Sequence, residues 1–123
     1  MLSLLALALV VASAAPTHLT IEPWTGKDLV PTATTTAKFR LVVNGKPNAT
    51  LHLQATEVAD GWLGAFCTPN VCSPQRVDVT LPKSGHAVYQ FELIREEDNA
   101  PAKSGARVVS DDGAFVEVPA ASR

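Results

Sequence analysis

The chain has 123 residues, which is the usual length of one domain. Its 10 Lys and Arg are nearly balanced by 12 Asp and Glu, and this balance excludes the strongly basic surface that nucleic-acid-binding proteins present. Hydrophobic residues make up 46% and charged residues 18% of the sequence, which excludes a largely disordered chain, while two Cys and three His are too few for a cysteine-dense scaffold or a multi-ligand metal cage.

The N-terminal segment, residues 1–14, has the pattern of a secretory signal peptide. Residues 2–11 are almost uninterrupted apolar sequence, and the Ala-Ser-Ala that follows is the small-residue pattern of a cleavage site. The apolar run is shorter than the ~20 residues of a membrane-spanning helix, and no Lys or Arg precedes it. We therefore expect cleavage after Ala14 and export of residues 15–123 as one secreted or periplasmic domain without a membrane span. A retained membrane anchor is the alternative.

Period-two alternation of apolar and polar residues is the main pattern of the remaining chain, and it predicts short β-strands. In the first half it marks residues 18–22, 37–43, 50–56 and 62–66. An Asn-Gly turn signal at 44–45 follows the second of these strands, and Asp60-Gly61 ends the third. Each strand has one apolar and one polar face, as expected for antiparallel sheets packed face to face.

In the second half the alternation marks residues 76–81, 87–93 and 107–110, and a last strand that contains Val116 and Val118. In the strand at 87–93, Tyr89 and Phe91 are predicted to face inward, with Gln90 and Glu92 outside. Asp111-Asp112-Gly113 predicts the turn before the last strand. Seven or eight short strands at spacings of about 8–12 residues predict an all-β fold, an antiparallel β-sandwich.

The two cysteines lie close together in the sequence. Cys67 and Cys72 flank four residues in which Pro69 and Asn70 suit the central positions of a β-turn. In an exported protein this spacing predicts a disulfide that closes a short loop and contributes about 2 kcal/mol. The four-residue spacer differs from the C-x-x-C motif of thioredoxin-like enzymes. Redox chemistry, free thiols and metal binding by this pair remain the alternatives.

Four segments carry a resemblance to a known class of domain: residues 39–44, 61–62, 77–85 and 89–93. Their order of strand, Pro-and-Gly turn and returning strand resembles bacterial secreted immunoglobulin-like modules of the cell-adhesion-related and glycosidase-associated types. The resemblance covers roughly residues 36–118. It implies an immunoglobulin-like sandwich in a secreted protein and carries no catalytic residue across. The Cys67–Cys72 loop departs from the pattern, and the cysteines on two distant strands of antibody domains are absent.

Residues able to bind metal ions are few. The three histidines, His18, His52 and His86, are expected to be solvated surface residues, with a copper-type site as the alternative. The acidic residues at 96–98 and at 111–112 lie beyond opposite ends of a strand of about five residues, or ~17 Å. One shared calcium site is therefore not expected, and no cofactor is predicted.

No catalytic motif is evident. Ser84, His86 and Asp78 are close in sequence, but nothing resembles a nucleophile elbow, and the acidic residues offer no cleft for a carboxylate pair. Asn48-Ala49-Thr50 is an N-glycosylation acceptor sequence that matters only in a host that glycosylates its secreted proteins. We predict a protein that is not an enzyme.

The leading functional hypothesis is an exported immunoglobulin-like module that binds a protein or a cell-envelope partner, or that is structural. A disulfide-stiffened loop loses less entropy on binding, so this loop and the 96–104 loop are the candidate contact surfaces. The candidate contact residues are Trp62, Phe66, Pro69, Asn70, Glu96, Glu97 and Asp98. Core packing of the aromatic residues, Trp24 included, is the alternative. The alternative function is a small exported metal-binding protein that uses the histidines.

Overall fold

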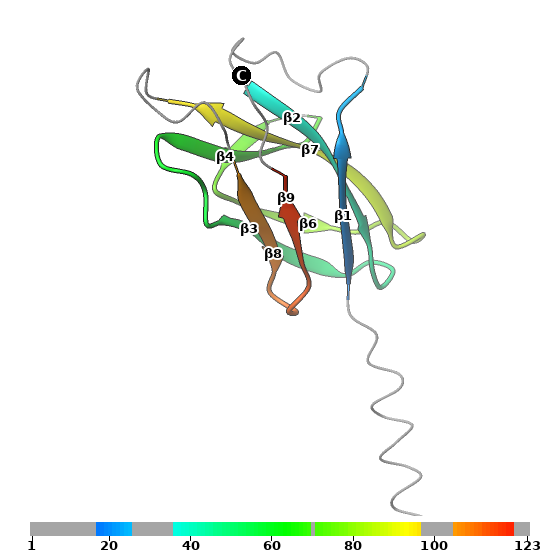
Figure 1. Ribbon diagram of the computed structural model, residues 1–123. Helices are drawn as coiled ribbons and strands as arrows, with labels where there is room; N and C mark the ends of the chain where they lie inside the picture. Colours follow the sequence, from blue (N-terminus) through cyan, green and yellow to red (C-terminus); the bar gives the residue numbers. More distant parts are fainter. Residues whose placement is uncertain (1–16, 26–35, 70, 97–104, 120–123) are drawn as a thin grey trace, which may run out of the picture.

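The computed structural model describes residues 17–25, 36–69, 71–96 and 105–119 (Figure 1). The predicted signal peptide and its cleavage site, together with Asn70, Glu97 and Asp98, lie outside these ranges. Over the described ranges the chain is all-β, with nine strands and no helix. None of these residues belongs to a helix of the length and apolar character that a membrane crossing requires.

The nine strands form two antiparallel sheets. In chain order they are β1 (His18–Pro23), β2 (Thr36–Asn44), β3 (Thr50–Thr56), β4 (Trp62–Cys67), β5 (Cys72–Pro74), β6 (Arg76–Thr80), β7 (His86–Arg95), β8 (Ala106–Ser110) and β9 (Phe115–Val118). Five strands pair in the order β1-β2-β7-β4-β5 and four in the order β6-β3-β8-β9. The predicted all-β fold with antiparallel sheets is confirmed. The strand that the alternation did not reveal is β5, which has three residues.

The core lies between the sheets and follows from the alternation. In β3, Leu51, Leu53 and Ala55 are buried, and the residues between them face solvent. They join one apolar cluster with the inward residues of the other strands, in which the rings of Phe66 and Phe91 lie 5.0 Å apart. Full burial of such side chains contributes about 1.5–3 kcal/mol each, so the cluster is the main source of stability.

Two connections join the sheets at their sides, one through the backbone of Gln75 and one through the side chain of Asp112. Gln75, with φ 66°, lies where the chain passes from β5 in one sheet to β6 in the other. Its N–H donates to the carbonyl of Gly64 in β4, and its own carbonyl accepts from Ala55 in β3, both at 2.8 Å. On another side, the Thr17 N–H donates to Asp112 Oδ2 at 3.2 Å and ties the start of β1 to the β8–β9 turn. The sheets are thus fixed relative to each other by hydrogen bonds as well as by the core.

The predicted turn at 111–113 is confirmed as the β8–β9 hairpin connection. The Gly113 N–H donates to the Ser110 carbonyl at 3.0 Å, and Gly113 has φ 97°, which glycine adopts without steric cost. This tight turn holds Asp111 beside β3, because its N–H donates to the His52 carbonyl at 3.1 Å.

Candidate functional site

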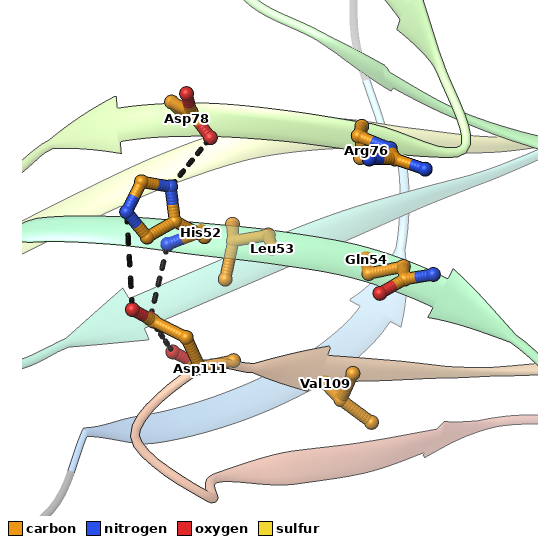
Figure 2. A pocket seen from close by; sticks show the side chains of 8 residues that line it. His52, Leu53, Gln54, Arg76, Asp78, Val109 and Asp111 are labelled. Atoms are coloured by element: carbon orange, nitrogen blue, oxygen red, sulfur yellow. Dashed lines mark hydrogen bonds and ion pairs between the residues drawn. The ribbon is translucent and has the colours of Figure 1, made fainter.

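The outer face of the four-stranded sheet has a shallow, open hollow of about 320 Å³. Figure 2 shows His52 on β3 between Asp78 on β6 and Asp111 at the end of β8. The residues that line the hollow are His52, Leu53, Gln54, Arg76, Asp78, Val109, Ser110 and Asp111. Because β3 turns Leu51 and Leu53 into the core, its intervening side chains face outward. The strand register then places His52 beside Asp78 and Gln54 beside Arg76.

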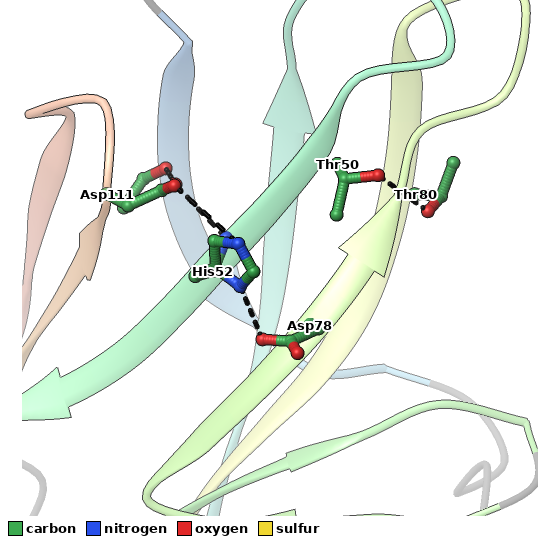
Figure 3. Close-up of polar contacts among 6 residues, drawn as sticks. Thr50, His52, Asp78, Thr80 and Asp111 are labelled. Carbon is green, nitrogen blue, oxygen red and sulfur yellow. Dashed lines mark hydrogen bonds and ion pairs between the residues drawn. The ribbon is translucent and has the colours of Figure 1, made fainter.

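His52 is held between two carboxylates. Its Nδ1 lies 2.7 Å from Asp78 Oδ1, and its Nε2 lies 3.9 Å from Asp111 Oδ2 (Figure 3). Asp111 is itself oriented, because its Oδ1 accepts from the His52 backbone N–H at 3.1 Å and from the Ser110 hydroxyl at 3.4 Å. The imidazole therefore has one ring nitrogen in a short hydrogen bond and the other facing a fixed carboxylate.

This setting raises the pKa of His52. The hydrogen bond to Asp78 is the main cause, followed by the negative charges of Asp78 and Asp111, and a slight loss of hydration opposes them. The protonated imidazole can donate to Asp78 and attract Asp111 at the same time. The site thus favours a positively charged group between its two carboxylates, whether that group is the imidazolium or a bound cation.

Further polar pairs continue along the same face. The hydroxyls of Thr50 and Thr80 are 3.2 Å apart in the row next to His52 (Figure 3). Beyond the hollow, Arg107 Nε donates to Glu117 at 2.7 Å, and its guanidinium lies 5.0 Å from the ring centre of Phe115, which is 58% exposed. This face is thus a polar surface held by paired side chains, with the exposed Phe115 ring on its edge strand β9.

The predicted disulfide between Cys67 and Cys72 is confirmed. The two cysteines are direct cross-strand partners in β4 and β5, with Cα atoms 3.9 Å apart. Between them, the Thr68 N–H donates to the Val71 carbonyl at 2.9 Å, and Val71 is exposed. The bond therefore closes a tight hairpin on the outer face of the five-stranded sheet.

The predicted solvent exposure of Gln90 and Glu92 is wrong. Both side chains face away from the core as the alternation requires, but only 0% and 1% of their surfaces are exposed. The Gln90 side-chain amide donates to Glu92 Oε1 at 3.1 Å, and Glu92 Oε2 lies 3.6 Å from Cys67 Sγ. A sulfur in a disulfide carries no proton, so this last contact is not a hydrogen bond. Alternation identifies the face of a strand but not what covers that face.

The predicted contact residues lie in different environments. Trp62 and Phe66 are buried in the core, at 6% and 0% exposure, so their rings are not available to a partner in this conformation. Pro69 and Glu96 are exposed. Asn70, Glu97 and Asp98 lie outside the described residues, and their predicted role stays a prediction. The two candidate aromatic residues therefore belong to the packing alternative.

The three histidines are exposed, but they lie on two different sheets. His18 and His86 are on the outer face of the five-stranded sheet, in one row on either side of Asn44. His86 Nδ1 is 2.8 Å from Asn44 Oδ1. His52 is on the four-stranded sheet, so the histidines do not form a single three-imidazole metal site.

The sequence indicated neither the His52 site nor the cluster around Glu92. His52, Asp78 and Asp111 are each ordinary polar residues of a strand or turn, and only the pairing of β3 with β6 and β8 brings them together. No family model, curated protein or solved structure matches this chain.

Proposed function

We propose that this chain is an exported, non-enzymatic immunoglobulin-like module that binds a protein or a cell-envelope partner through the hollow on its four-stranded sheet. The observation that carries the proposal is the outward, ordered cluster of His52, Asp78 and Asp111. Side chains on paired strands are held more precisely than side chains on loops, which reduces the entropy lost on binding. The disulfide supports export, because disulfides persist in oxidising compartments.

The charges of the hollow indicate what a partner needs. Asp78 and Asp111 flank His52, and Arg76 lies one row farther along the sheet, beside Gln54. A complementary surface places a basic or hydrogen-bond-donating group over the two carboxylates and an acidic group over Arg76. Such matched charges contribute to orientation and association rate more than to affinity.

Site-specific photo-crosslinking in the producing cells tests this proposal. A photo-crosslinking amino acid replaces Gln54 in the hollow or, as the matched control, the exposed Lys83 beyond β6. We expect one discrete adduct from position 54 that is absent at position 83. Combining position 54 with Asp78→Asn and Asp111→Asn should remove it. Equal adducts at both positions, or none at 54, would contradict the proposal.

One observation favours metal binding as a second candidate function. Asp78 accepts a hydrogen bond from His52 Nδ1 and so directs Nε2 toward Asp111 Oδ2, 3.9 Å away. A carboxylate that orients a histidine in this way is typical of metal-binding imidazoles, and a copper-type divalent ion suits such a nitrogen and oxygen pair. Calorimetric titration with Cu²⁺ should show binding that His52→Ala abolishes and His86→Ala leaves intact. The reverse pattern would exclude this site.

A further inference from the structure

A second cluster lies on the outer face of the other sheet, around the disulfide. The sulfur atoms of Cys67 and Cys72 and a carboxylate oxygen of Glu92 all lie within 4.8 Å of one another. The three residues come from β4, β5 and β7, which lie side by side in the five-stranded sheet in the order β7-β4-β5. Cys67 and Glu92 are buried, whereas Cys72 is half-buried and leaves a route from solvent.

Within the described part of the chain, no proton donor contacts Glu92 Oε2 while the disulfide is intact. Gln90 donates to Oε1, but Oε2 faces the Cys67 sulfur at 3.6 Å, and that sulfur has no proton to give. Buried polar atoms normally have a hydrogen-bond partner, either from the protein or from ordered water. Reduction would give the Cys67 sulfur a proton to donate to this oxygen, and the thiolate form of Cys67 could share a cation with it.

We propose that reduction of the Cys67–Cys72 disulfide creates a site for a thiophilic divalent cation of the zinc type, with both sulfurs and Glu92 as ligands. The reduction takes two electrons and two protons from a dithiol reductant, which becomes a disulfide as the two cysteine thiols form. Cation binding then releases the thiol protons to solvent, because the thiolate is the ligand.

The ligand set suits such an ion. The four-residue spacer between the cysteines falls within the C-x₂₋₄-C spacing of zinc sites, and carboxylate oxygens also bind Zn²⁺. Three protein ligands leave the fourth position for water. Gln90, which donates to Oε1, orients the carboxyl group as an outer residue of the site. This inference does not depend on partner binding at the hollow, which lies on the other sheet.

Cobalt titration of the full chain tests the proposal, with Co²⁺ as the spectroscopic probe. The chain is reduced with a phosphine, which leaves the metal free for the protein, and a parallel sample stays oxidised. We expect the reduced chain to bind one Co²⁺ with a thiolate-to-cobalt charge-transfer absorption, and Zn²⁺ to displace it. The oxidised chain and the Cys67→Ser/Cys72→Ser variant should show no such absorption.

Glu92→Gln separates the three-ligand site from simple thiol binding. It should weaken Zn²⁺ binding at least about tenfold, whereas Glu22→Gln, an exposed acid on the same sheet, should leave the affinity unchanged. Circular dichroism reports whether each reduced chain is folded. A reduced chain that loses its β-signal should regain it with Zn²⁺. No charge-transfer absorption in a folded reduced chain, no refolding with Zn²⁺ or equal affinity in the Glu92→Gln chain would each overturn the proposal.

Discussion

At the scale of single residues, one contact dominates the state of the candidate site. The short hydrogen bond between His52 and Asp78 holds the ring in one orientation, while Asp111 acts mainly through its charge at 3.9 Å. His52, Asp78 and Asp111 are all exposed, so neither contact is expected to contribute much to the stability of the fold. The two contacts instead determine the charge and the orientation of the imidazole, and these properties decide which ligand it can bind.

The first prediction follows from the ranking of these two carboxylates. Asp78→Asn should lower the pKa of His52 more than Asp111→Asn does, because the former removes both the hydrogen bond to the ionised group and the nearer charge. NMR titration of the imidazole protons measures the shift directly. Thr80→Ala, which removes a neighbouring hydroxyl pair on the same two strands, is the matched control and should leave the His52 midpoint in place. Equal shifts in the two Asp variants would contradict this account.

At the scale of elements, a hydrogen bond to one glycine, Gly85, connects two turns. The β6–β7 turn contains Gly85 with φ 72°, and the Gly45 N–H of the β2–β3 connection donates to the Gly85 carbonyl at 2.8 Å. A Cβ added at Gly85 would lie 2.2 Å from the Gly45 carbonyl oxygen. The resemblance over residues 77–85 implies a Pro-and-Gly turn here, but the close approach of a second turn depends on the pairing of β2 with β7.

The second prediction compares this glycine with another that also has a positive φ. Gly85→Ala should destabilise the fold by about 2–4 kcal/mol, because backbone strain adds to a steric clash. Gly113→Ala should cost only about 1 kcal/mol, since its added Cβ meets nothing within 4 Å and only the backbone strain remains. Urea denaturation measures both losses. If the two losses were equal, the close contact with Gly45 would have no energetic effect.

The sequence predicted the positions of the strands better than the burial of the side chains on their outer faces. The alternation in β2, β3 and β7 identified the strands and the residues that enter the core, because period two is a local property of each strand. It missed β5, which is too short to show a period, and it placed Gln90 and Glu92 in solvent. Which residues cover the outer face of a sheet depends on the whole fold, so a local pattern in the sequence does not predict the burial of side chains on that face.

At the scale of the whole molecule, both sites combine residues that are distant in the chain. His52 lies 26 residues from Asp78 and 59 from Asp111, and Cys67 lies 25 residues from Glu92. Strand order and register bring these groups together, and both are set by long-range packing. Spacing in the sequence therefore revealed the disulfide, whose cysteines are five positions apart, but neither of the two clusters.

The hydrogen bond between Thr17 and Asp112, which connects the two sheets, also makes the stability of the fold depend on pH. Burial alone would raise the pKa of Asp112, but hydrogen bonds to this carboxylate outweigh burial and lower it. The largest of these comes from the Thr17 side chain, followed by those from the Ala114 N–H, the Ser110 side chain and the Thr17 N–H. A lowered pKa in the folded state gives stability that is present above the unfolded value and is lost as pH falls through the folded value. The raised pKa of His52 acts in the opposite direction, since its contribution is lost as pH rises.

The third prediction is that Asp112→Asn destabilises the protein in a pH-dependent way. At about pH 7 the variant should unfold at lower urea concentration than the wild type, because it lacks the charge that strengthens the hydrogen bond between β1 and the β8–β9 turn. The difference should shrink as pH falls below about 4, where protonation removes the same charge from the wild type. Urea midpoints across this range give the measurement. A difference that stays constant from about pH 7 to about pH 3 would show that the charge of Asp112 does not hold the two sheets together.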